Sequence, residues 1–159
     1  MKHPRTLAFA LLATLAGSAA AHGPGHAMPN RLVGVWKADV AIGPCSLPNP
    51  VAFFSAYNTY HEGGTVSDFN WTSPTLRAPG HGIWKSIGNG QYQTRFQFFR
   101  YDTAPPATAS GRQDVRVVIT LDAGGNGYTG VISGQQLTLN GAPAGPALCG
   151  QVIATRMGL

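Results

Sequence analysis

Short apolar runs separated by glycine-containing turns make up most of this sequence from Val33 onward. The runs are rich in Val, Ile, Phe, Tyr, Trp and Thr, the residue types that favour extended strands. They cover the ranges 33–43, 51–61, 65–71, 82–87, 91–101, 113–122, 127–139 and 147–156. Long helices normally carry many Glu, Lys and Arg residues, and only 11% of this chain is charged. The pattern therefore predicts an all-β domain of eight strands.

The turns between the runs predict how the strands are connected. Residues that readily adopt a positive φ occur at Gly63-Gly64, Asn89-Gly90, Asn126-Gly127 and Asn140-Gly141. Such turns join neighbouring strands as antiparallel hairpins. Two longer connections, 72–80 and 102–111, contain prolines, and we interpret them as candidate mobile loops at one mouth of the structure.

Two of the runs show clear alternation of apolar and polar residues. The sets that share one face are Tyr92, Thr94, Phe96 and Phe98 in one run, and Val115, Val117, Ile119 and Leu121 in the other. Each strand therefore has one buried and one solvated face. Eight such strands leave no exposed edge when they close into an antiparallel up-and-down barrel, which is the fold we predict. A two-sheet sandwich is the alternative that the pattern leaves open.

The first 21 residues have the organisation of a cleavable signal peptide. Two basic residues precede an apolar run over 7–16, and Ala19-Ala20-Ala21 fits the cleavage rule. The apolar run is much shorter than the about 20 residues that a membrane span requires. We therefore expect a secreted or periplasmic protein without a membrane span. Its mature chain would hold a flexible leader at 22–32 and the barrel domain at 33–159.

The charge of the mature chain is modest. Loss of Lys2 and Arg5 with the signal would lower the formal net charge from +5 to +3. The remaining basic residues are scattered along the sequence, whereas a nucleic-acid-binding surface gathers them in a patch. We therefore expect no nucleic-acid partner.

The chain contains two cysteines, Cys45 and Cys149. In an exported protein, an even number of cysteines favours a disulfide over a metal site or free thiols. The bond would join the beginning of the barrel domain to its end. For a closed loop of about 100 residues, the loss of chain entropy in the unfolded state corresponds to about 4–5 kcal/mol of stability.

Two stretches of the sequence resemble known proteins. Gly34-Val35-Trp36 at the start of the first run, with Arg156 at the end of the last, resembles the lipocalin (calycin) pattern. The run from Ser73 to Trp84, followed by Gly88-x-Gly90-x-Tyr92, resembles uncharacterised secreted bacterial barrel proteins. This resemblance covers residues 33–156 and implies a lipocalin-like barrel. It also implies structural roles for Gly34, Trp36 and Arg156, with the basic side chain stacked on the tryptophan at the barrel base.

The resemblance further implies a cavity for one small apolar molecule, because eight strands leave an interior that side chains either fill or leave as a single pocket. We expect the ligand-binding residues Trp84, Tyr92, Phe96 and Phe98 inside the barrel. His81, between two glycines beside the longer loop, is expected at the pocket mouth. The alternative is that the aromatic side chains simply fill a packed core. Our leading hypothesis is a protein that binds a small hydrophobic or amphipathic ligand, without catalysis or a cofactor.

Two other functions remain open from the sequence. Lipocalin-like barrels include isomerases and cyclases, so His81 is a candidate acid–base group of a cavity enzyme. Cleavage after Ala21 would make His22 the N-terminus, where the amine and imidazole of one residue can bind copper together with a second histidine. No Gly-x-Ser-x-Gly, His-Glu-x-x-His or phosphate-loop motif indicates another class of enzyme.

Overall fold

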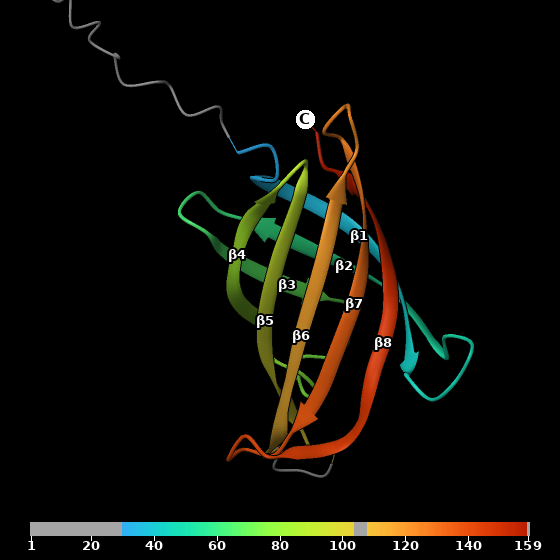
Figure 1. The fold of residues 1–159 in the computed structure, drawn as a ribbon. Coiled ribbons are helices and arrows are strands. Elements are labelled where there is room, and N and C mark those ends of the chain that lie inside the picture. Colours follow the sequence, from blue (N-terminus) through green and yellow to red (C-terminus); the bar gives the residue numbers. More distant parts are fainter. Residues whose placement is uncertain (1–29, 104–107, 159) are drawn as a thin grey trace, which may run out of the picture.

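The computed structural model describes residues 30–103 and 108–158, which form eight β-strands and no helix. The strands are β1 (Gly34–Pro44), β2 (Ala52–Tyr60), β3 (Thr65–Asn70), β4 (Gly80–Gly88), β5 (Gln91–Tyr101), β6 (Ala109–Leu121), β7 (Gly127–Leu137) and β8 (Pro143–Arg156). Each strand pairs antiparallel with the next, and β8 pairs with β1 to close the barrel (Figure 1). The predicted up-and-down barrel is confirmed, and the two-sheet sandwich is excluded. Within the described ranges, no helix is long and apolar enough to cross a membrane.

The signal-peptide prediction (1–21), His22 and all but the last three residues of the expected leader lie outside the described residues. Leu32, the last residue assigned to that leader, is fully buried. Its carbonyl oxygen accepts a hydrogen bond of 2.9 Å from the indole nitrogen of Trp36. Leu32 therefore packs as part of the barrel core, one residue before the boundary expected from the sequence.

Three strands begin earlier than the residue pattern predicts. β4 begins at Gly80, β6 at Ala109 and β8 at Pro143, whereas the apolar runs suggest starts at 82, 113 and 147. The added residues are mostly small, glycine or proline, which have low intrinsic preference for strands. Most of them are extended because a neighbouring strand pairs with them. Irregular pairing of β5 with β6 and of β7 with β8 accommodates two of these extensions.

The two ends of the barrel differ. The turns β2–β3, β4–β5 and β6–β7 lie at the end where the chain enters β1 and leaves β8, which we call the base (uppermost in Figure 1). The connections β1–β2, β3–β4, β5–β6 and β7–β8 lie at the other end, the mouth. Because strand direction alternates, both long connections predicted from the sequence fall at the mouth.

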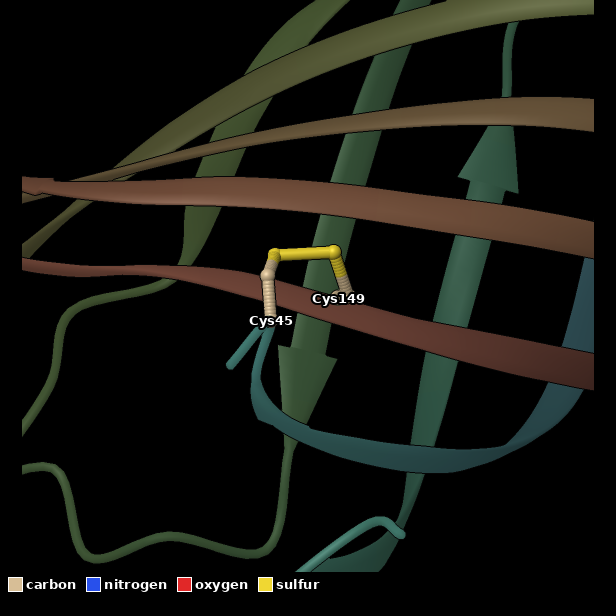
Figure 2. Close-up of a disulfide and its surroundings, with 2 residues drawn as sticks. All are labelled: Cys45 and Cys149. Carbon is tan, nitrogen blue, oxygen red and sulfur yellow. A yellow bond between two sulfur atoms is a disulfide. The ribbon is translucent and has the colours of Figure 1, made fainter. Parts of the chain in front are cut away.

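The predicted disulfide between Cys45 and Cys149 is present, with Cα atoms 4.8 Å apart (Figure 2). Cys45 follows the last residue of β1, and Cys149 lies in β8, the strand that closes the barrel against β1. The amide of Cys45 also donates a hydrogen bond of 2.9 Å to the carbonyl oxygen of Ala147. The disulfide therefore fastens the β1–β8 closure near the mouth.

Aromatic side chains fill the interior at the base. The ring centroids of Trp36 and Tyr128 are 4.9 Å apart. Tyr60 lies edge-on to Trp84 at 6.1 Å, and Trp84 to Tyr92 at 5.9 Å. Such tilted and edge-on pairs are favourable arrangements of aromatic rings. All five side chains are at most 7% exposed, so this half of the interior is packed.

Arg156 covers this base from the end of β8. Its guanidinium carbon lies 4.2 Å from the ring centroid of Trp36, within cation–π range. Its Nη1 donates to the carbonyl oxygen of Val33 at 2.7 Å, and its Nε to that of Gly125 at 2.9 Å. Gly34 leaves room for the guanidinium, since a Cβ there would lie 2.6 Å from Nη1. Arg156 thus joins the chain before β1 to the β6–β7 turn.

Candidate functional site

Between the packed base and the mouth, the barrel contains a cavity of about 320 Å³. Cavities that bind small ligands commonly measure about 300–1,000 Å³. The walls are mainly apolar and include Val40, Ile42, Phe54, Val115, Ile132 and Val152. The interior is therefore packed at one end and hollow toward the other.

The five residues expected to bind a ligand lie in three different places. Phe96 and Phe98 line the cavity. Trp84 and Tyr92 also face the interior, but they belong to the packed base and not to the cavity wall. The expected inner aromatic face and its alternative, a packed core, therefore each describe one part of the barrel.

His81 does not lie at the cavity. It is exposed on the outer face of β4 and is not among the residues that line the hollow. The reason is strand alternation: Trp84 points inward, so Gly80 and Gly82 share its face and His81 takes the opposite one. The expected position of His81 at the pocket mouth differs from the structure by this one step in register.

A row of polar side chains that the sequence analysis did not identify faces the cavity. The Tyr128 hydroxyl donates to Oδ1 of Asn58 at 3.4 Å, and Nδ2 of Asn58 donates to Oδ2 of Asp68 at 3.0 Å. The other oxygen of Asp68 forms an ion pair with Nη2 of Arg77. The side chains of Asp68 and Arg77 are 5% and 9% exposed. The two charges are buried together, and each satisfies the other.

The two tyrosines at the bottom of the cavity are held in their neutral form. Burial raises the pKa of Tyr60 well above its ordinary value, and the neighbouring Tyr128 and Asp68 raise it further. Burial also raises the pKa of Tyr128 to about 12, although the adjacent Tyr60 hydroxyl partly opposes that shift. At neutral pH, both side chains are therefore uncharged phenols rather than phenolates.

Part of the β3–β4 connection lies along β5 at the mouth. The amide of Ala78 donates to the carbonyl oxygen of Phe99, and the amide of Tyr101 to that of Leu76, each at 2.9 Å. We call residues 76–78 the strap. It places the side chains of Leu76 and Arg77 in the cavity lining. The segment interpreted as a mobile loop is thus partly hydrogen-bonded to a strand.

The other buried acid lies on the outer surface. Asp114 accepts hydrogen bonds from Nε of Arg95 at 2.7 Å and from Nε2 of Gln97 at 2.9 Å. Burial alone would raise its pKa, but these hydrogen bonds and the charges of Arg95 and Arg116 outweigh burial and lower it. Asp114 therefore belongs to a surface ion pair and not to the cavity.

Neither the protein-family models nor the curated proteins compared with this sequence give a match. Across the described part of the chain, no three or more His, Cys, Asp and Glu side chains are grouped to hold a metal ion. The function is therefore argued from the geometry of the cavity.

Proposed function

We propose that this protein is exported and binds one small hydrophobic or amphipathic molecule in the barrel cavity, without catalysing a reaction on it. The observation that carries the proposal is the cavity of about 320 Å³ with apolar walls and a buried polar row. Ligand sites in proteins combine these features: apolar walls contribute affinity, and a few polar groups orient the ligand.

Export is supported by two independent features. Residues 1–21 have the pattern of a signal peptide. The Cys45–Cys149 disulfide is of the kind that forms in oxidising compartments and is rare in the cytosol. We therefore propose a secreted or periplasmic location.

Binding is favoured over catalysis by the state of the ionisable groups. An acid–base catalyst works best when its pKa lies near the working pH. Among the described residues, the acid that lines the cavity is Asp68, which is paired with Arg77, and the raised pKa values of Tyr60 and Tyr128 move both away from neutrality. His81 lies on the outer face, so the cavity-enzyme alternative lacks the residue on which it was based.

The proposal is tested by filling the cavity. Ala56 is buried and lines the hollow, so Ala56→Phe adds a ring to the space that the ligand would occupy. Ala41→Phe, on the other face of the neighbouring strand, is the matched control. We expect the neutral fluorophore N-phenyl-1-naphthylamine to bind the wild type and Ala41→Phe alike. Its affinity for Ala56→Phe should fall by about tenfold or more, a loss of about 1.4 kcal/mol.

Thermal unfolding curves of the three proteins establish that each variant is folded. No saturable binding by the wild type would contradict the proposal. Equal affinity of folded Ala56→Phe and the wild type would also contradict it, because the probe would then bind elsewhere.

A further inference from the structure

We infer that the ligand is an amphipathic anion whose oxyanion head lies between Arg77 and Arg100 at the mouth end of the cavity. This inference rests on the proposed function and adds the charge and orientation of the molecule. Three observations support it: the net charge of the cavity lining, the pairing of the strap with β5, and a buried hydrogen-bond donor on Arg100.

The charged side chains that line the cavity are Asp68, Arg77 and Arg100. The chain has six acidic residues, and all of them lie in the described ranges. Of these six, Asp68 pairs with Arg77, and Asp114 pairs with arginines on the outer surface. Across the described residues, no acidic side chain forms an ion pair with Arg100. Asp68 is the one acid among the lining residues, so the cavity lining keeps a net charge of +1.

Arg77 and Arg100 are opposite each other in an antiparallel bridge between the strap and β5. Residues directly opposite in such a pair project to the same face, and like charges in that arrangement repel. Both side chains accordingly line the cavity. A bound oxyanion between them would remove the repulsion, because two guanidinium groups can donate several charge-assisted hydrogen bonds to one carboxylate or sulfate.

The two arginines differ in their hydrogen bonding, and Arg100 is the one with a donor left for a ligand. Arg77 is held by Asp68, and its guanidinium carbon stacks 3.7 Å from the ring centroid of Phe98. The Nε of Arg100 is buried and has no hydrogen-bond acceptor among the described residues. The Nε of Arg112 is also without an acceptor there, but Arg112 does not line the cavity. Because an unpaired buried donor is costly and Arg100 faces the cavity, a bound ligand can supply its acceptor.

The walls beyond the arginines explain why the anion has an apolar body. Val115, Ile132 and Val152 face the same hollow and offer no charge or hydrogen bond to a hydrophilic ion. The polar row from Tyr128 to Asp68 is already hydrogen-bonded within itself. We therefore place the head at the mouth and the apolar part against these walls. A carboxylate head and a sulfate head both carry the negatively charged oxygen atoms that the two arginines would bind.

The test is displacement of N-phenyl-1-naphthylamine by four competitors: decanoate, decyl sulfate, decanol and acetate. The wild type should bind decanoate or decyl sulfate at least about tenfold more tightly than decanol, since a paired charge contributes more than about 1.4 kcal/mol here. Arg100→Met should lower the ratio of the decanoate affinity to the decanol affinity, both measured on that variant, to about one. Arg116→Met, the same change on the outer face at a side chain that is 62% exposed, should keep the preference.

The outcomes separate the two proposals. If the neutral probe binds in the cavity but decanoate, decyl sulfate and decanol displace it equally, the anion inference is wrong and the binding function stands. If the wild type binds no probe, both are wrong. Displacement by acetate as effective as by decanoate would also overturn the inference, because the apolar body would then contribute nothing. A preference for only one of the two anions supports the inference and identifies the head. Arg100→Gln, checked by thermal unfolding, replaces Arg100→Met if that variant does not fold.

Discussion

Tyr128 stands at the boundary between the two halves of the barrel interior. Its ring packs against Trp36 in the base, while its hydroxyl donates to Asn58 in the polar row of the cavity. Because the phenol is buried, ionising it would place a charge in an apolar environment. We therefore expect the packing of the base to weaken in alkaline solution, where Tyr128 would ionise.

Stability should fall in alkaline solution because of this tyrosine. The pKa of Tyr128 is raised to about 12, whereas a tyrosine in the unfolded chain ionises near pH 10. Its contribution is complete below about pH 10 and is lost as the pH rises through 12, for a total of about 2–3 kcal/mol. The raised pKa of Tyr60 acts in the same direction. Urea unfolding at pH 8 and pH 11 measures the difference.

Tyr128→Phe should reduce this difference, since the phenylalanine ring cannot ionise. Tyr57→Phe is the control, because Tyr57 is 47% exposed and lies on the outer face. The same alkaline loss in Tyr128→Phe and in the wild type would show that another group causes it.

At the scale of elements, the end of β8 holds together segments that are distant in the sequence. Arg156 donates to the carbonyl oxygens of Arg31, Val33 and Gly125 while covering Trp36. These carbonyl groups lie in the chain before β1 and in the β6–β7 turn. The arginine thus satisfies backbone acceptors at the base that neighbouring strands do not pair.

We expect Arg156→Met to lower the free energy of unfolding by about 2–4 kcal/mol, since methionine fills similar space but donates no hydrogen bond. Arg116→Met should cost less than about 1 kcal/mol, because its ion pair with Asp114 is long and exposed. Urea unfolding at neutral pH compares the two. Similar small losses in both variants would mean that Arg156 contributes no more than a surface pair.

At the scale of the whole molecule, closure depends on the pairing of the first strand with the last. β1 and β8 form a continuous register from Trp36 opposite Arg156 to Pro44 opposite Leu148. The disulfide lies at the mouth end of this pairing and Arg156 at the base end. The closing seam is therefore secured at both ends.

Removal of the disulfide should destabilise the whole barrel rather than one loop. The cross-link joins positions 104 apart in the sequence, for which the entropy estimate is about 4–5 kcal/mol. The double variant Cys45→Ser, Cys149→Ser and the reduced wild type should lose similar stability in a single cooperative transition. A loss below about 1 kcal/mol in both would show that hydrogen bonding of β1 to β8 suffices.

The sequence was informative about strands and weaker about the cavity. Local alternation and glycine-containing turns predicted all eight strands, because both signals depend on residues close together in the chain. The starts of β4, β6 and β8 were missed, since pairing partners and not propensity extend them. Asn58 and Asp68 occupy alternate positions with buried residues in their strands. A polar residue at a position that alternates with buried residues was therefore the sequence signal that could have identified the polar row of the cavity.

The position of His81 was also predicted incorrectly from the sequence. A histidine between two glycines at a strand start suggests a pocket, but the face it takes depends on which neighbours point inward. Arg77 was not singled out at all, because it lies in a connection whose path is decided by pairing with β5. Alternation from the inward Trp84 could have placed His81 on the outer face, whereas the position of Arg77 cannot be obtained from spacing along the chain.

The sequence alone determined the all-β class, the hairpin order and the two cysteines that pair, because alternation, turn chemistry and residue composition act locally. Only the tertiary structure decided that the interior is packed at the base and hollow at the mouth. It also decided that Arg77 and Arg100 meet there, while Asp68, the acid in the cavity lining of the described chain, is already paired with Arg77. The physical reason is that barrel closure brings together inward-facing side chains from eight separate strands. Whether these side chains fill the interior, and which of their charges meet, depends on that three-dimensional arrangement.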